Sequence, residues 1–251
     1  MKYTIIALTL FLMIKSTLAG TLTDDFSDGN MDGWRKSKHA FFDQSAQWSV
    51  EKGELVCTSQ NVCGAASVLC ISENTPGINP IWRDYEFECQ FKLEQTFPVG
   101  CANWGALIGF GIYFDDTQGN GIDFGVRTDW AANNIWNQFR CEKFFLGVWE
   151  DIGRGIFITN QEKWYTAKIL ANGNKYEMFI DDTLICNPKI GLPDKGSAFI
   201  FARNCEVHFD NIVITGDNIP DFDMSSQSVS PKAVSPKGKV AKTWAKIKNP
   251  H

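Results

Sequence analysis

Hydrophobic and polar residues alternate over much of the middle of the chain. In DYEFECQFKLE, residues 84–94, aromatic and aliphatic side chains take every second position and glutamate, glutamine or lysine the positions between. Successive side chains of a β-strand point to opposite faces, so this period of two predicts a half-buried strand of an antiparallel sheet.

Further short stretches have the composition of strands and are bounded by Gly, Asn, Asp or Pro turns. They are QWSVE, GELVCTS, ASVLCIS, ALIGFGIYF, GIDFGVR, FFLGVWE, KWYTAKILA, KYEMFI, TLIC, SAFIFAR and CEVHFDNIVIT. Asp181-Asp182 between KYEMFI and TLIC predicts a two-residue hairpin turn. Because no long amphipathic helical pattern precedes the C-terminal tail, we expect an all-β fold, an antiparallel two-sheet β-sandwich.

The two ends of the chain differ from this body. Residues 1–19 combine Lys2, an apolar run and a small-x-small site at Thr17-Leu18-Ala19, which predicts a signal peptide and a secreted protein, extracellular or periplasmic. The apolar run is shorter than the roughly 20 residues of a spanning helix, so no transmembrane segment is expected. We expect one β-sandwich domain over residues 20–220 and a disordered Lys/Ser/Pro-rich tail over residues 221–251.

Charge is distributed unevenly between body and tail. Residues 20–230 hold 29 acidic and 16 basic side chains, whereas residues 231–251 hold six lysines and no acid. An acidic body argues against nucleic acid as a partner, because phosphates require basic surfaces. The basic tail could contact an anionic surface, or be simply solvated.

All eight cysteines follow the predicted signal peptide. An even count in an exported chain predicts a disulfide framework, and the spacing lacks the C-x2-C pairs of metal sites. We expect Cys186 to pair with Cys205 between two late strands. A second bridge, Cys101–Cys141, would hold two loops together.

Several motifs at the ends of the body resemble the concanavalin A-like lectin/glucanase superfamily, in its laminin-G-like jelly-roll branch. They are TDDFSDGNMDGW with WSVEKGELVC, then WYTAKILANGNKYEMFIDDTLI, and finally GSAFIFARNCEVHFDNIVITG. The resemblance covers roughly residues 20–216 and implies a jelly roll whose first and last strands lie side by side. Such a pattern supports the fold far better than it supports a function.

The resemblance also implies a structural calcium ion near those two strands. Asp24 or Asp25 would meet Asp210, and Asp28 or backbone oxygens would complete an oxygen shell for a hard cation. The alternative is that Asp25 caps a turn and Asp210 bonds neighbouring backbone amides.

Tryptophans sit in or beside loops rich in amides and acids. In RTDWAANNIWNQFR, residues 127–140, Asp129, Trp130, Asn134 and Trp136 form a set able to stack on a sugar ring and bond its hydroxyls. Trp104, in FPVGCANWGAL, would belong to a second rim, and Trp149 is also near a predicted loop. The alternative is that these indoles cap the core.

Evidence for catalysis is weaker. The glucanase relatives use an E-x-D-x-x-E strand motif that this chain lacks, and Glu86 with Glu88 is the nearest carboxylate pair. Such a pair is more often the solvated face of a strand, as His208 beside Asp210 is more often packed or surface-exposed. The sequence therefore favours a secreted carbohydrate-binding or adhesion module whose partner is a glycan. A glycoside-active enzyme of a non-glucanase branch and a structural or interaction protein are the alternatives.

Overall fold

A computed structural model of the chain describes residues 19–98, 105–128, 137–145, 148–191 and 193–226. Those residues form strands, turns and loops and contain no helix, which confirms the all-β prediction. Within them, no helical segment meets the length and hydropathy of a membrane span.

The first sheet, sheet A, has the strand order β13-β12-β11-β6-β15-β1-β16, and β4 pairs with β15 and with β3. Its strands are β1 (Gly20–Asp24), β3 (Gln47–Glu51), β4 (Glu54–Thr58), β6 (Tyr85–Thr96), β11 (Trp164–Asn172), β12 (Lys175–Ile180), β13 (Thr183–Cys186), β15 (Cys205–Gly216) and β16 (Phe222–Asp223).

The second sheet, sheet B, has the order β10-β9-β8-β7-β14-β5-β2 with antiparallel pairing throughout. Its strands are β2 (Trp34–Lys36), β5 (Ser67–Ile71), β7 (Ala106–Asp115), β8 (Asn120–Thr128), β9 (Gln138–Phe145), β10 (Val148–Ile156) and β14 (Ser197–Arg203).

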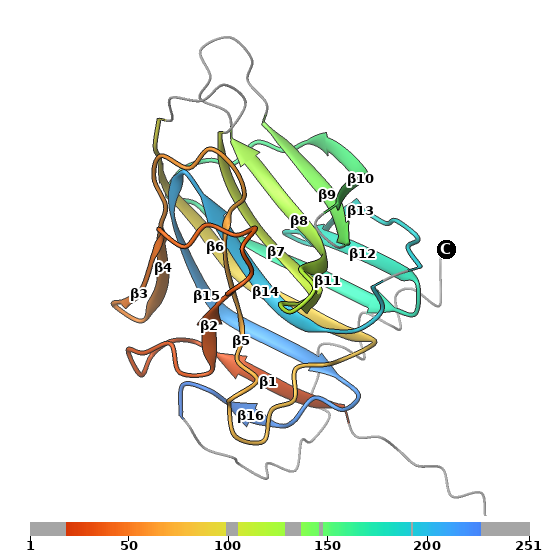
Figure 1. The fold of residues 1–251 in the computed structure, drawn as a ribbon. Coiled ribbons are helices and arrows are strands. Elements are labelled where there is room, and N and C mark those ends of the chain that lie inside the picture. The colour runs from red at the N-terminus through yellow and green to blue at the C-terminus, as the bar shows by residue number, and fades with distance from the viewer. Residues whose placement is uncertain (1–18, 99–104, 129–136, 146–147, 192, 227–251) are drawn as a thin grey trace, which may run out of the picture.

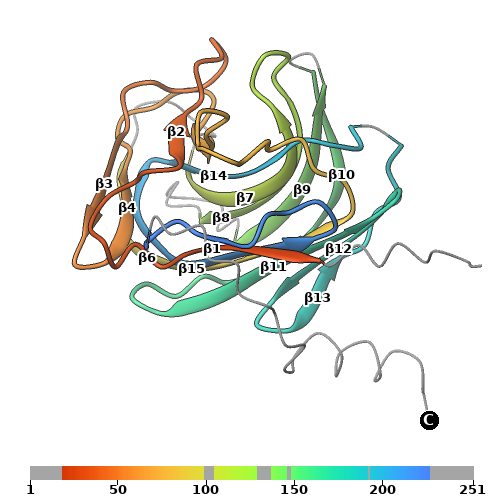
Figure 2. The ribbon, with the colours of Figure 1, turned by 90° about the horizontal axis from the view of Figure 1, so that it is seen from below.

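The two sheets pack face to face as a sandwich (Figure 1). The inward residues of both build one core, in which Phe91 of β6 meets Phe110 of β7 at 5.6 Å between ring centroids and Phe110 meets Phe124 of β8 at 5.1 Å. Figure 2 shows that β14, β7, β8, β9 and β10 curve into a trough that opens away from sheet A. The outer face of sheet B is therefore concave.

The first strand lies beside the last long strand, as predicted. Asp24 of β1 is opposite Ile212 of β15, and the register continues to Gly20 opposite Gly216. The predicted hairpin also forms: Ile180 pairs with Thr183, and Asp181 and Asp182 have φ of 47° and 61°, the positive values that a type I′ turn requires.

One strand prediction is wrong. FFLGVWE is not a single strand, because β9 ends at Phe145, β10 begins at Val148, and the two pair as neighbours with Phe145 opposite Val148. A continuous apolar run concealed the change of direction.

The predicted start of disorder at Asp221 is also too early. Phe222 and Asp223 pair in parallel with β1, and Met224 is buried against the core, in contact range of Gly33. Apolar Phe222 and Met224 extend the body to residue 226, and the rest of the predicted tail lies outside the described residues, as does nearly all of the predicted signal peptide.

Both predicted disulfides require correction. Cys141, Cys186 and Cys205 are thiols here, and Cys101 lies outside the described residues. Cys186 and Cys205 belong to β13 and β15, which are four strand positions apart in sheet A. At about 4.8 Å per position, this separation far exceeds the 4.4–6.8 Å between the Cα atoms of a disulfide.

Candidate functional site

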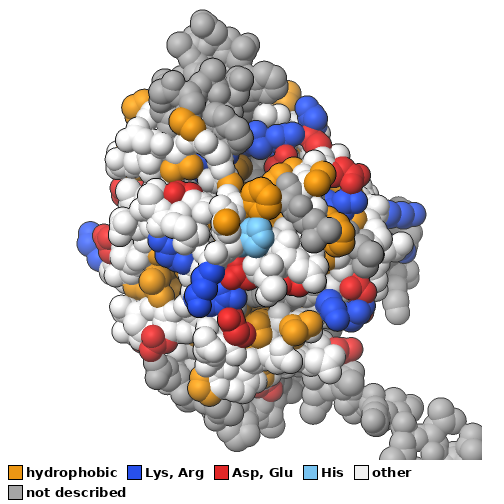
Figure 3. Space-filling model, viewed as in Figure 1, with side chains coloured by type: hydrophobic (Ala, Val, Ile, Leu, Met, Phe, Trp, Pro, Cys, Tyr) orange, Lys and Arg blue, Asp and Glu red, His pale blue; other side chains and the backbone are white. Residues whose placement is uncertain are grey.

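A groove of about 580 Å³ crosses the concave outer face of sheet B. Six of the seven strands of that sheet approach it. It is lined by Phe42, Ala65, Ala66, Val68, Leu107, Asp123, Arg127, Arg140, Glu142, Trp149, Asp151, Phe199, Phe201 and Arg203. Figure 3 looks onto this face, where hydrophobic side chains lie beside His39 with acidic and basic side chains above and to the right of them.

Aromatic rings that lie over glycines form the floor beside and beneath the groove. Phe201 and Phe199 of β14 lie across Gly109 and Gly111 of β7, in the space that a Cβ atom would fill. Phe144 of β9 lies over Gly121 in the same way, 2.5 Å from where its Cβ would be. The missing side chains therefore let large rings lie flat on the sheet while remaining fully buried.

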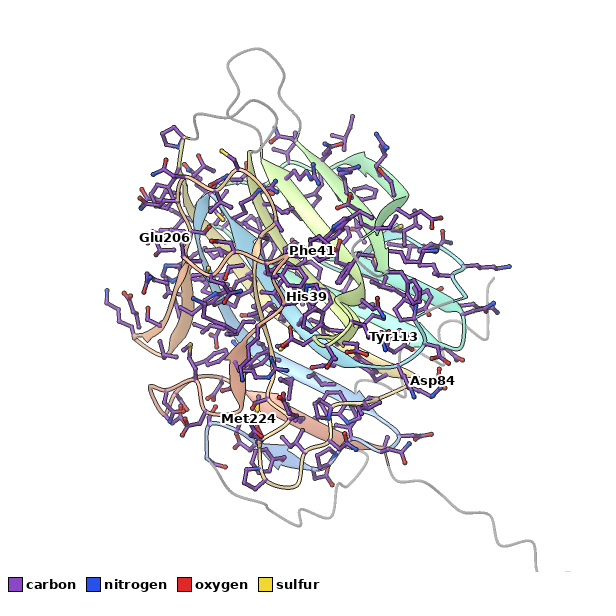
Figure 4. The ribbon with its side chains drawn as sticks, viewed as in Figure 1. His39, Phe41, Asp84, Tyr113, Glu206 and Met224 are labelled. Atoms are coloured by element: carbon purple, nitrogen blue, oxygen red, sulfur yellow. The ribbon has the colours of Figure 1, made fainter. Side chains whose placement is uncertain are left out.

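A loop between β2 and β3 closes one end of the groove. Its Phe42 packs on Phe114 and Phe144, with ring centroids 5.7 and 6.1 Å apart. His39 lies over Gly119 in the turn between β7 and β8, and stacks on Phe41 at 5.1 Å, as Figure 4 shows in the middle of this face. Hydrogen bonds from Ser37, Lys38 and Arg35 to Asp116 fasten this loop to that turn.

Charged side chains occupy the other end, on β8, β9 and β10. Asp123 and Glu142 are directly opposite each other in the β8–β9 pairing, so both face the groove. Arg140 forms an ion pair with Glu142 at 3.1 Å and donates to Asp151 at 2.9 Å, and Arg127 reaches Glu142 at 3.5 Å. Glu142 is thus paired with both Arg127 and Arg140, and Arg140 is also paired with Asp151.

Burial changes the acid–base behaviour of this cluster. Burial raises the pKa of Asp123 well above its usual range, repulsion from Glu142 adds to the effect, and Arg127 and Arg140 only partly oppose it. For Asp151, burial also raises the pKa, but the hydrogen bond and charge of Arg140, with the charge of Arg154, outweigh it and lower the pKa. The groove therefore presents two carboxyl groups whose pKa values are shifted in opposite directions on adjacent parts of one surface.

Arg203 keeps its charge at neutral pH. Burial lowers the pKa of Arg203 to about 10, with repulsion from Arg127 contributing, and its guanidinium donates to the carbonyls of Gly64 at 2.6 Å and Gly105 at 3.3 Å. The Nε of Arg127 is buried and has no hydrogen-bond partner among the described atoms. Such a buried donor is costly to leave unpaired.

Trp149 supplies an exposed aromatic face at the edge of the groove. It is 43% exposed and stacks on Phe144 with ring centroids 4.6 Å apart and planes inclined by 28°. Because Phe144 holds one face of the indole from below, the other face is presented in a fixed orientation.

Most sequence-predicted binding residues fall outside the described residues: Trp104, Asp129, Trp130, Asn134 and Trp136. The strand ends that flank them are described and lie together, since Ala106 pairs with Thr128 and Arg127 pairs with Gln138. Arg127 also lines the groove. Both predicted rim loops therefore leave the sheet at the end of the groove that holds Arg127.

The predicted calcium ligands have other contacts. Asp24 is buried and accepts hydrogen bonds from Phe26 N, Trp34 Nε1 and Ser225 Oγ at 2.8–2.9 Å. Burial raises the pKa of Asp24 to about 6, although these hydrogen bonds act in the opposite direction. Asp25 accepts from Ser27 N, and Asp210 from Asn211 N. Among the described residues, no group of three His, Cys, Asp or Glu has metal-binding geometry. These donor contacts fit the turn-capping alternative better than a cation shell, and calcium stays a prediction.

The other acidic candidates lie on the outer face of sheet A. Lys168 of β11 pairs with Glu86 at 3.1 Å and Glu88 at 2.7 Å, and His208 bonds Glu54 at 2.6 Å. These residues form the solvated ion-paired face of a strand, away from the groove.

Sequence reasoning missed most of the groove. The glycines of GFGIYF and GNGIDFG indicate the groove, because their spacing places them on one face of β7 and β8. The sequence does not show which aromatic ring covers each glycine, because that depends on the order of strands in the sheet.

No protein-family model and no curated protein matches the sequence. Solved structures resemble it in fold. The carbohydrate binding module CBM66 from Bacillus subtilis is 16% identical with a TM-score of 0.56, covering 74% of this chain and 98% of that one. A native glycosidic hydrolase is 11% identical with a TM-score of 0.57, covering 80% and 97%. The Bacillus licheniformis beta-glucanase is 12% identical with a TM-score of 0.55, covering 78% and 98%.

Identities this low establish the fold alone. The chain has the concanavalin A-like jelly-roll fold that the sequence motifs predicted, whereas the laminin-G-like branch stays a prediction.

Proposed function

We propose that this protein is a carbohydrate-recognition module that holds a glycan in the groove of sheet B. The observation that carries the proposal is the combination of an exposed, stacked Trp149 with charged donors and acceptors in one concave groove. Its volume of about 580 Å³ lies within the range of roughly 300–1,000 Å³ that is usual for small-molecule sites.

The groove offers both kinds of contact that a sugar requires. The free face of Trp149 suits the apolar C–H face of a pyranose or furanose ring. Sugar hydroxyls can donate to Glu142 or Asp151 and accept from the guanidinium groups that line the groove. The proposal is supported by structural neighbours that include a carbohydrate binding module.

Trp104, Asp129, Trp130, Asn134 and Trp136 remain candidates for an upper rim. The described strand ends that flank their segments lie next to Arg127. The secreted location also remains a proposal, which N-terminal sequencing of the exported protein would test at the Ala19–Gly20 bond.

The test is binding to a glycan array, followed by calorimetry on the best ligand, with wild type and Trp149→Ala. Loss of the stacking face should weaken binding by about 10-fold to 100-fold, because a central aromatic anchor contributes on the order of 1.4–3 kcal/mol.

The matched control is Trp164→Ala, which removes an indole from the outer side of sheet A, where Lys92 lies 5.0 Å from its ring centroid. It should leave affinity unchanged. Equal affinity of wild type and Trp149→Ala, or no binding across the array, would contradict the proposal.

A second candidate function is glycoside hydrolysis in the same groove, favoured by the Asp123–Glu142 pair. Two adjacent carboxyl groups whose environments separate their protonation states can divide into acid and base roles. Burial raises the pKa of Asp123, which suits that carboxyl to the acid role.

Release of reducing sugar from a polysaccharide panel tests this second function. Activity abolished by Asp123→Asn and by Glu142→Gln, but retained by Glu88→Gln on sheet A, would establish it. Binding without product release would reject it and leave the recognition function intact.

A further inference from the structure

Two buried cysteines from different sheets meet at one side of the sandwich. Cys141 lies in β9 of sheet B and points inward, between the groove residues Arg140 and Glu142, which point outward. Cys186 ends β13 at the edge of sheet A, and its thiol is hydrogen-bonded to that of Cys141. Strand β13 lies close to β10, as Figure 1 also shows.

A glycine makes room for this meeting. Gly153 of β10 is opposite Cys141 at a bulge, and a Cβ atom there would lie 2.7 Å from Sγ of Cys186 and 3.8 Å from Sγ of Cys141. Cys186 is 9% exposed and Cys141 is fully buried, so a reagent from solvent reaches Cys186 first.

We propose that Cys141 and Cys186 form a disulfide that ties the edge of sheet A to the strand of sheet B that carries the charged end of the groove. The bridge joins the sheets at a side where no backbone ladder connects them. It also replaces Cys101–Cys141 and Cys186–Cys205 as the pairing of these two cysteines.

The reaction is thiol–disulfide exchange with an external disulfide, such as oxidised glutathione or a disulfide oxidoreductase. The Cys186 thiol loses its proton, and the thiolate attacks the external disulfide and releases one thiol, which takes up a proton. The Cys141 thiol then loses its proton and displaces the second external thiol from Cys186. Two protein thiols are oxidised, and one external disulfide is reduced to two thiols.

Local contacts favour this order of events. The hydrogen bond from Cys141 lowers the pKa of the Cys186 thiol, and the backbone N–H of Asn187 acts in the same direction. Burial and the hydrogen bond to Cys186 raise the pKa of Cys141. Cys186 is thus the more readily ionised sulfur as well as the more accessible one.

The experiment equilibrates the full chain in a glutathione buffer, blocks remaining thiols and maps peptides without reduction. A peptide pair linked through Cys141 and Cys186 is expected. The bridge closes a loop of about 45 residues, so the oxidised form should melt about 8–16 °C above the form reduced at these two cysteines.

Cys186→Ser should abolish the linked pair and the shift in melting temperature. Cys89→Ser is the matched control, because Cys89 is equally buried in β6 and has no cysteine neighbour among the groups that shift its pKa. Recovery of Cys141 and Cys186 as blocked thiols, or linked to other cysteines, in oxidised wild-type protein would overturn the proposal without reference to either variant.

Discussion

On both outer faces of this sandwich, inward and outward side chains alternate along the strands, but the outward side chains of the two sheets differ in kind. On sheet A the outward positions hold long charged side chains, such as Glu86, Glu88 and Lys168, which pair with one another in partial contact with solvent. On sheet B the outward positions of β7 and β8 include glycines, and rings from neighbouring strands lie over Gly109, Gly111 and Gly121.

The difference lies in how much water each face retains. Surface ion pairs are worth only about 0–1 kcal/mol. In the groove, burial raises the pKa of Asp123, whereas the neighbouring arginines lower the pKa of Asp151. Perturbed groups in a cleft are typical of functional sites, so the concave face is where binding or catalysis belongs.

The largest loss of stability is expected when a side chain is added to a glycine on the floor of the groove. Gly109→Ala puts a Cβ atom inside the ring of Phe201 and should destabilise the fold by about 2–3 kcal/mol, as overpacking does. It should also abolish glycan binding, because the displaced ring moves into the groove. Chemical denaturation and calorimetry measure the two effects.

Gly191→Ala is the control for that change, since nothing lies within 4 Å of its Cβ position. Equal stability of the two variants would mean that the floor is loosely packed.

An intermediate effect is expected when matched carboxylates are neutralised on the two faces. Glu142→Gln leaves Arg127 and Arg140 without their shared anion and should cost about 1–2 kcal/mol and most of the glycan affinity. Glu88→Gln on sheet A should cost about 0–1 kcal/mol and no affinity. Equal losses in denaturant unfolding would show that the two faces are energetically alike.

The smallest effect is expected from Asp123→Asn, and it depends on pH. The folded pKa of Asp123 is raised above the ordinary value of 3.8, so its stabilising contribution is complete below about pH 4 and is lost as pH rises through the folded pKa. The variant lacks this titration. The free energy of unfolding of wild type minus that of the variant should therefore fall as pH rises above 4.

The control is Glu88→Gln, for which that difference should not show the same fall. A difference for Asp123→Asn that is constant from pH 4 to pH 9 would contradict the buried, protonated carboxyl.

Much of the fold could be predicted because a period of two records which side of each strand is buried. Strand β3 coincides with the predicted QWSVE, and β6 overlaps the predicted DYEFECQFKLE and continues to Thr96. The hairpin at Asp181-Asp182 followed from local turn chemistry.

The site could not be predicted in the same way, since it depends on which strands become neighbours. Asp123 and Glu142 are separated along the chain and meet only through the β8–β9 pairing. The sulfurs of Cys141 and Cys186 meet only where two sheets pack. Periodicity carries no information about either arrangement, so the sequence directed attention to loops and to Glu86 with Glu88 instead.

The glycines beneath the rings have a consequence for how this surface could diversify. A substitution at Gly109, Gly111 or Gly121 must displace a ring, so the floor resists change one residue at a time. Trp149 and the loop that holds His39 and Phe41 sit above that floor and tolerate replacement more readily. Selection for a new ligand would therefore substitute residues at the rim of the groove and retain the glycines of its floor. Homologues that bind different ligands should share these glycines and differ in the residues around them.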